Sequence, residues 1–232
     1  MKDWRMIDQR IWKSLFAFAS LMAGLAVMAR LPGAYALPAD REIVIVAYGD
    51  SLTAGFQLPQ TQSFPAQLEK ALKARGHKVR VINSGVSGDT AADGLARFDW
   101  AMQEPADAAI LELGANDALR GLAVAETRKN LAVILARFKK KRMDVLIAGM
   151  EALRNWGDDY ARDFRDMYAS LAKENEALLY PFFLDGVALN PQLNLADGMH
   201  PTEKGVAIIV ERILPEVETL IERVKTRRAK ES

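Results

Sequence analysis

The segment GDSLTAG, residues 49–55, places an acid and two hydroxyls on a glycine-flanked turn directly after an apolar run. The serine could be a nucleophile, the turn could hold a phosphate, or it could simply begin the next helix. A nucleophilic serine needs a base within hydrogen-bond reach and a third group that orients this base. The chain has two histidines, His77 and His200, so a histidine base must be one of them.

Asp197 and His200 lie close together in the segment DGMHP. A tight turn through Gly198 could bring the carboxylate to one imidazole nitrogen and leave the other nitrogen for a serine proton. Pro201 would then begin the last helix, because proline suits the first helical position. The same residues could also be simple turn formers before that helix. His77 precedes a predicted strand, so we expect it to be an ordinary turn residue.

Two further residues could stabilise the negative charge that develops during acyl transfer, which needs preorganised hydrogen-bond donors. Gly88, in SGVSGDT, lacks a side chain, so its backbone N–H could approach a substrate closely. Asn116, in GANDALRG, could offer its side-chain amide. Both residue types are also common turn formers. From the residues alone, Ser87 remains a second possible nucleophile.

The elements that must position these residues alternate in type along the chain. Apolar runs typical of strands cover 43–48, 78–83, 107–113, 143–149 and 177–183, and stretches with helical spacing cover 63–75, 89–103, 121–141, 158–175 and 202–226. This alternation predicts an α/β fold in which helices cover both faces of a parallel sheet. The candidate residues follow predicted strands, at the edge where such sheets bind ligands.

The composition excludes several classes of function. The 31 basic and 30 acidic residues give a formal net charge of +1, which provides no electrostatic footprint for nucleic acid. The chain has no cysteine, so thiol catalysis, thiolate metal sites and disulfides are excluded. We expect a small-molecule substrate, no cofactor, no metal, no nucleic-acid partner, and a monomer or weak oligomer.

The first 36 residues differ in kind from the rest. Basic residues precede an uncharged stretch from Ser14 to Ala29, and the small-residue sequence AYA ends at Ala36. This is the pattern of a secretory signal peptide, and an uncleaved inner-membrane anchor is the alternative. We expect residues 1–36 to be removed, leaving a single periplasmic or secreted domain over residues 37–232 without stable membrane insertion.

Four segments in order, GDSLTAG, SGVSGDT, LGANDALRG and DGMHP, resemble the blocks of the SGNH hydrolases, the GDSL-type esterases. The similarity covers roughly residues 43–215 and is greatest to the bacterial periplasmic thioesterase I, lysophospholipase and arylesterase branch. It implies a flavodoxin-like three-layer α/β/α sandwich with a five-stranded parallel sheet. It also implies cleavage of acyl esters or thioesters through an acyl-enzyme.

The resemblance implies a role for each motif residue. Ser51, not Ser87, would be the nucleophile, His200 its base and Asp197 the partner of that base. The backbone N–H groups of Ser51 and Gly88 and the side chain of Asn116 would form the oxyanion hole.

This chain departs from the branch at two places. It has Gly114-Ala115-Asn116-Asp117 where the branch often has Gly-Gly-Asn-Asp, a change that should leave the amide in place. It has EALRNWG, residues 151–157, where relatives often carry prolines, which concerns the shape of the acyl groove and not the chemistry.

Other residues near these motifs have predicted supporting roles. We expect Asp50 to brace its loop without acting as an acid, and Thr53 to cap a turn. Candidates to line the acyl groove are Phe56, Leu119, Met150, Trp156 and Met199. Of these, Trp156 should set the preferred acyl length.

Three alternatives come from other classes. A flavin phosphate-binding module would leave the segment DGMHP without a purpose. A metallohydrolase using Asp197 and His200 lacks an H-E-x-x-H motif or a second clustered histidine. A catalytically inactive interaction domain would not react with serine-directed organophosphates.

Overall fold

The computed structural model describes residues 41–231, so the predicted signal segment over residues 1–36 lies outside this part of the chain. The described residues contain a five-stranded sheet of parallel strands in the order β2-β1-β3-β4-β5. The strands are β1 (Ile43–Gly49), β2 (Val79–Gly85), β3 (Ala108–Glu112), β4 (Asp144–Ala148) and β5 (Leu178–Tyr180). The prediction of a flavodoxin-like parallel sheet is confirmed.

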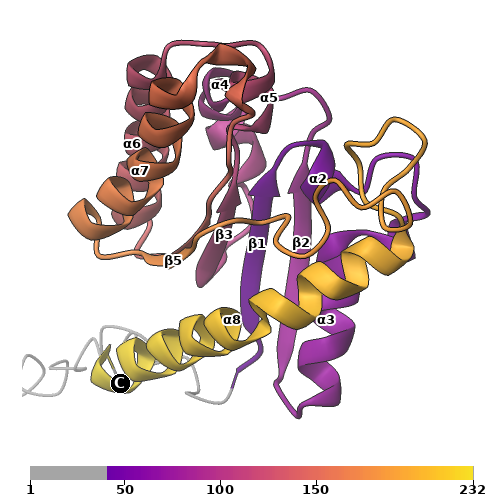
Figure 1. Ribbon diagram of the computed structural model, residues 1–232. Coiled ribbons are helices and arrows are strands. Elements are labelled where there is room, and N and C mark those ends of the chain that lie inside the picture. The colour runs from indigo at the N-terminus through magenta and orange to yellow at the C-terminus, as the bar shows by residue number, and fades with distance from the viewer. Residues whose placement is uncertain (1–40, 232) are drawn as a thin grey trace, which may run out of the picture. The chain divides into compact units, whose positions relative to one another are not determined.

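Helices cover both faces of this sheet (Figure 1), with α3 and α8 on one face and α4, α6 and α7 on the other. Their bounds are α3 (Phe64–Ala74), α4 (Ala91–Ala101), α6 (Val124–Lys140), α7 (Asp158–Glu174) and α8 (Glu203–Glu231). Four short helical segments were not predicted: α2 (Ser51–Ala54), η1 (Gln60–Gln62), α5 (Ala115–Leu119) and η2 (Arg154–Trp156). Both α2 and α5 begin just after a strand, and each carries a candidate site residue.

The central strand β1 is buried along its whole length because helices cover both faces of the sheet. On the side of α4 and α6, its last large side chain, Tyr48, packs edge-on against Phe98 and Phe138, with ring centroids 5.9 Å away in each case. Its hydroxyl donates a hydrogen bond to the carbonyl of Gly94 on α4. This packing fixes the end of β1, where the GDSL turn (residues 49–52) begins.

Strand order reverses at β1, because the chain passes from β1 to β2 on one side and then to β3 on the other. Ligands of open parallel sheets bind beyond the carboxyl ends of the strands at such a point. Ser51 follows β1, Gly88 follows β2 and Asn116 follows β3. The topology therefore gathers the three candidate residues at the carboxyl-terminal end of the strands.

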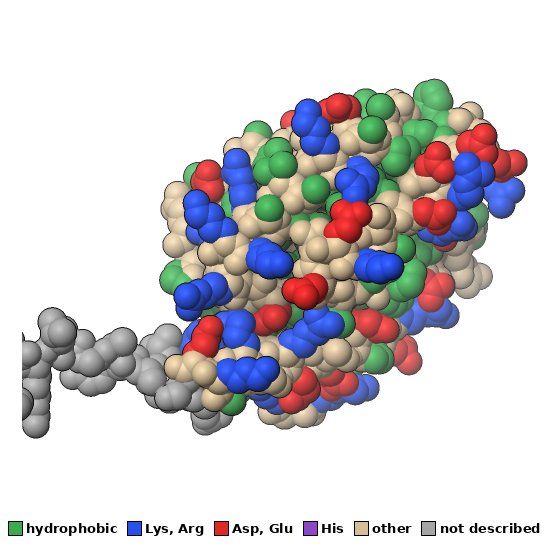
Figure 2. Space-filling view, turned by 90° about the vertical axis from the view of Figure 1, so that its left-hand side faces the viewer, with side chains coloured by type: hydrophobic (Ala, Val, Ile, Leu, Met, Phe, Trp, Pro, Cys, Tyr) green, Lys and Arg blue, Asp and Glu red, His purple; other side chains and the backbone are tan. Residues whose placement is uncertain are grey.

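Charges of both signs are interspersed on the face that Figure 2 shows, the side on which α6 and α7 lie. An ion pair of 2.6 Å between Arg128 and Glu174 joins these two helices. This face therefore offers no extended basic patch of the kind that binds nucleic acid. Among the described residues, no helix is both long and apolar enough to cross a membrane.

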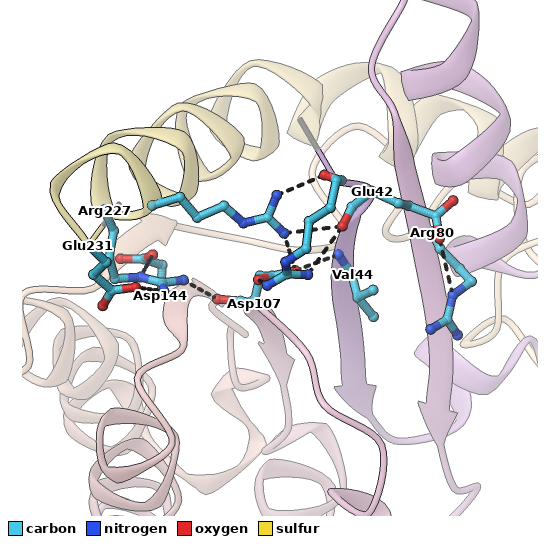
Figure 3. A network of polar contacts seen from close by, with 9 residues as sticks. Glu42, Val44, Arg80, Asp107, Asp144, Arg227 and Glu231 are labelled. Carbon is cyan, nitrogen blue, oxygen red and sulfur yellow. Dashed lines mark hydrogen bonds and ion pairs between the residues drawn. The ribbon is translucent and has the colours of Figure 1, made fainter. Parts of the chain in front are cut away.

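At the amino-terminal end of the strands, carboxylates and guanidinium groups form a network (Figure 3). Asp107, which precedes β3, accepts hydrogen bonds of 2.9 Å from the Val44 N–H and 2.7 Å from Arg228 of α8. Arg227 donates to Asp144 over 2.9 Å and to the Asp107 carbonyl over 3.0 Å. The network fastens the end of α8 beneath β1, β3 and β4.

Candidate active site

The conformation of the GDSL turn is fixed by a helix cap at Asp50 and by a position that admits only glycine. Asp50 caps α2 by accepting a hydrogen bond of 2.9 Å from the Leu52 N–H, and Ser51 occupies the first position of the helix. A side chain at Gly49 would lie 2.1 Å from Thr53 Oγ1 and 2.5 Å from the Glu112 carbonyl oxygen, so only glycine fits. Ser51 is 8% exposed at the end of the buried strand.

A closed loop before α8 supplies the histidine and the aspartate. Asp197 Oδ1 accepts hydrogen bonds from the backbone N–H groups of Met199 (2.9 Å) and His200 (3.0 Å), while its Oδ2 lies 2.7 Å from His200 Nδ1. Gly198 allows the turn because its φ is +73°. Hydrogen bonds from the N–H groups of His200 and Met199, and then from the imidazole, lower the pKa of Asp197 to about 2. Asp197 is therefore a carboxylate at neutral pH.

The last helix begins later than predicted. Pro201 was expected to start it, but Pro201 forms an isolated antiparallel bridge with Asn194, and α8 begins at Glu203. Thr202 Oγ1 accepts a hydrogen bond from the Gly205 N–H over 3.2 Å and so occupies the capping position. The bridge closes the base of the loop that carries Asp197 and His200.

Ser51 and His200 meet across the two loops, with His200 Nε2 2.9 Å from Ser51 Oγ. When Nδ1–H donates to Asp197, Nε2 is left as the acceptor for the serine proton. The ring of Phe56 packs on the imidazole at a centroid distance of 4.4 Å and holds its plane. Ser87 lies on the exposed loop after β2 instead.

His77 lies away from this row of hydrogen bonds. Its Nε2 is 3.0 Å from Glu218 of α8. It stands just before β2, at the end of the strand opposite to Gly88. Its position agrees with the prediction that His77 has no part in the site.

The other two predicted oxyanion donors, Gly88 and Asn116, follow β2 and β3, the two strands that flank β1. Gly88 has a φ of +89°, and no atom lies within 4 Å of where its side chain would be, so its backbone borders open space. Asn116 Nδ2 donates to Asp50 Oδ2 over 3.1 Å and to the Asp89 carbonyl over 3.0 Å. Asp50 thus braces both its own turn and this amide, as expected. An oxyanion would have to share or replace one of the two acceptors of Asn116.

A buried glutamate beneath the GDSL turn was not identified from the sequence. Glu112, at the end of β3, is fully buried, and its Oε2 accepts hydrogen bonds from Thr53 Oγ1 (2.8 Å) and the Asp50 N–H (3.3 Å). The prediction that Thr53 caps a turn is therefore wrong, because Asp50 is the cap. A lone acid within the apolar run AAILEL, residues 108–113, was the signal that could have revealed Glu112.

Burial controls the protonation of this acidic pair. Burial, followed by the nearby charge of Asp50, raises the pKa of Glu112 well above its ordinary value of 4.5. Burial also raises the pKa of Asp50 to about 6, although hydrogen bonds from Leu52 and Asn116 oppose the shift. Burial therefore favours the neutral form of Glu112, which can lie next to the Asp50 carboxylate without like-charge repulsion.

A cavity of about 380 Å³ opens beside Ser51, Asn116 and His200. Its remaining lining is mainly apolar and includes Leu119, Met150, Leu153, Phe182, Leu189 and Met199. Three of the predicted groove residues, Leu119, Met150 and Met199, are therefore at the cavity.

Phe56 and Trp156 do not line this cavity, so the prediction that they do is wrong. Phe56 packs against His200, and the indole of Trp156 covers Gly121, where an added side chain would lie 2.6 Å from the ring. Leu153 and Asn155, from the same segment as Trp156, face the cavity in its place.

Among residues 41–231, no three His, Asp or Glu side chains gather closely enough to hold a metal ion.

Comparison with known proteins gave the following similarities. The model of the GDSL-like Lipase/Acylhydrolase family matches residues 47–208. An arylesterase of Vibrio mimicus is 36% identical over 174 residues, which are 75% of this chain and 87% of that protein. The thioesterase 1/protease 1/lysophospholipase L1 of Escherichia coli strain K12 is 33% identical over 178 residues, 76% of this chain and 84% of that protein. The crystal structure of AlinE4, an SGNH-hydrolase family esterase, is 44% identical with a TM-score of 0.66, covering 77% of this chain and 96% of that one.

A parallel α/β/α sandwich that presents serine, histidine and aspartate in one hydrogen-bonded row has the architecture of a serine hydrolase. The chain belongs to the GDSL-like lipase and acylhydrolase family, the SGNH hydrolases. It is a carboxylic ester hydrolase.

Replacement of Glu112 by glutamine should change how stability depends on pH. Because the pKa of Glu112 is raised in the folded state, the contribution of this residue to stability is fully present below its unfolded pKa near 4.5. That contribution is lost as pH rises toward the folded pKa. Glutamine does not ionise, so the stability of Glu112→Gln relative to the parent should increase between pH 5 and 8. The gain should reach up to about 1.4 kcal/mol per pH unit. Urea unfolding at both pH values measures it, and a difference that stays constant with pH would contradict the assignment.

Proposed function

We propose that Ser51 is the nucleophile of this ester hydrolase, that His200 is its general base, and that Asp197 orients and stabilises the imidazole. The observation that carries the proposal is the continuous row of hydrogen bonds, 2.9 Å from Ser51 to His200 and 2.7 Å from His200 to Asp197, beside an apolar cavity. Ser51 Oγ attacks the acyl carbon and His200 accepts its proton. His200 then protonates the leaving group, and water releases the acyl group by the same route.

The oxyanion of this reaction is proposed to bind the backbone N–H groups of Ser51 and Gly88 and the amide of Asn116. The N–H of Ser51 is at the first helical position, where it has no partner within the helix. Gly88 presents its backbone to open space. Asn116 is held by the Asp50 carboxylate, and the intermediate would take over its second hydrogen bond from the Asp89 carbonyl. Such donors act mainly on the transition state.

The proposed substrates are acyl esters and thioesters whose acyl chain enters the apolar cavity. Its volume of about 380 Å³ and the leucine and methionine residues in its lining suit a hydrocarbon chain. Names of relatives include an arylesterase and a thioesterase/lysophospholipase, so the leaving group differs among similar proteins. We therefore propose aryl esters, acyl thioesters and lysophospholipids as the substrate range.

Ser51→Ala should abolish hydrolysis of p-nitrophenyl acetate while leaving the fold intact. Removal of a triad nucleophile typically costs a factor near 10⁶, so activity should fall to background. The matched control is Ser87→Ala, on the neighbouring loop. It should retain kcat within about threefold of the parent, because the proposed contribution of this loop is the backbone N–H of Gly88 and not the Ser87 side chain. Loss of activity in Ser87→Ala alone would overturn the assignment of the nucleophile.

Leu153→Ala should change the preferred acyl length. Leu153 lines the cavity and is 57% exposed. Its truncation should therefore weaken the binding of long acyl chains by about 1 kcal/mol, which is roughly fivefold in kcat/KM. Acetate esters should be unaffected, because their acyl group carries only one methyl group. The matched control is Trp156→Ala, from the same segment but outside the lining. A series of p-nitrophenyl esters from two to twelve carbons tests both variants, and an unchanged profile for Leu153→Ala would exclude this segment from the acyl site.

We also propose that the enzyme is exported and acts in the periplasm or outside the cell. The support is the basic head, uncharged stretch and AYA sequence of residues 1–36. Expression of the full chain in a Gram-negative host should give a periplasmic product that begins at Leu37, as measured by intact mass and N-terminal sequencing. A product that keeps residues 1–36 and sediments with membranes would instead support the anchored form.

A further inference from the structure

One partly buried arginine connects the loops that carry the proposed oxyanion donors. Arg97, on α4, has a side chain that is 14% exposed. Its Nη2 donates to the carbonyl of Gly49 over 2.9 Å, and its Nε donates to Asp89 Oδ2 over 2.5 Å. The guanidinium lies over the ring of Tyr48, 4.2 Å from the centroid.

The partners of Arg97 are adjacent to the proposed donors. Gly49 ends β1 two residues before Ser51, and Asp89 directly follows Gly88. The carbonyl of Asp89 also accepts the hydrogen bond from the Asn116 amide over 3.0 Å. A single guanidinium therefore touches two of the three loops directly and reaches the third through Asp89.

We propose that Arg97 is a positioning residue that holds the GDSL turn and the Gly88 loop at the separation that the oxyanion hole requires. This inference rests on the proposed function, because it assigns to Arg97 the placement of donors that the proposed reaction uses.

Arg97 is itself held in place from both sides. It projects from α4, whose first turn is fixed by a capping box between Thr90 and Asp93. On the other side, the ring of Tyr48 is packed by Phe98 and Phe138. The guanidinium is planar and donates in fixed directions, so it can hold two acceptors at a set spacing, which an ammonium group on a flexible stem cannot do.

A second arginine contacts the same loop but is less suited to this role. Arg120 donates to the Gly88 carbonyl over 3.0 Å, and its side chain is exposed. Water competes for an exposed hydrogen bond and lowers its contribution. Asp89, by contrast, is 7% exposed, and its carboxylate forms an ion pair with Arg97.

Arg97→Met tests the proposal, with Arg228→Met as the matched control. Arg228, which is buried, also pairs with an aspartate, Asp107, but it lies at the amino-terminal end of the strands, away from the site. Both variants should lower the midpoint of urea unfolding. Because a displacement of about 1 Å can cost 10²-fold in rate, Arg97→Met should lower kcat on p-nitrophenyl acetate by about 10- to 100-fold with KM within twofold. Arg228→Met should leave kcat per folded molecule unchanged.

A double-mutant cycle separates a role in the oxyanion hole from general destabilisation. If Arg97 acts through the donors, the loss caused by Arg97→Met should be clearly smaller in the Asn116→Ala background than in the parent. Additive losses, or equal kcat losses in Arg97→Met and Arg228→Met, would overturn the proposal.

Asp89→Asn removes the same ion pair more conservatively and replaces Arg97→Met if that variant does not fold. It should lower kcat in the same way, and a normal kcat would overturn the proposal. Full activity of the Arg97 variant, with Ser51→Ala inactive, would overturn the role of Arg97 and leave the proposed function standing.

Discussion

The hydrogen bond between Ser51 Oγ and His200 Nε2 joins residues that are 149 positions apart, and two separate segments of the fold keep these atoms 2.9 Å from each other. One end depends on β1, whose buried run stops at Gly49 and delivers Ser51 into a turn too tight for any other residue at that position. The other end depends on the loop before α8, closed by the bridge between Asn194 and Pro201. The arginines of α8 fasten that helix at the far edge of the sheet. This network stabilises the fold at a distance from the site.

The carboxyl groups near this hydrogen bond differ in protonation because they differ in surroundings. Asp197 lies at the surface and accepts two backbone N–H groups, which keep its pKa near 2 and preserve the negative charge that an imidazolium needs. Glu112 lies fully buried beneath the turn, where burial raises its pKa and favours the neutral form. The charged carboxylate can stabilise a transient cation, while the neutral acid can fill the space below Gly49 without repelling Asp50. The carboxyl group therefore serves an electrostatic purpose in Asp197 and a structural purpose in Glu112.

The sequence allowed the sheet, the long helices and the positions of the motif residues to be predicted, because burial on both faces and strand ends leave clear patterns. It did not distinguish Ser51 from Ser87, since both follow strands, until the order of the four motifs was considered. Side-chain directions in irregular segments have no periodicity, so Trp156 was assigned to the cavity that Leu153 lines. Pro201 and Thr53 were assigned by local preference, but Pro201 forms a bridge with Asn194 and the Thr53 hydroxyl donates to the buried Glu112.

Covalent labelling with a fluorophosphonate tests the central claim most directly, because the reagent reacts with a serine only where a base and an oxyanion site activate it. Intact mass should show one phosphonate per molecule, and peptide mapping should place it on Ser51. The His200→Ala variant should label at least about 10³-fold more slowly, because its serine lacks a base. A phosphonate on Ser87, or labelling of Ser51 that is equally fast without His200, would contradict the account.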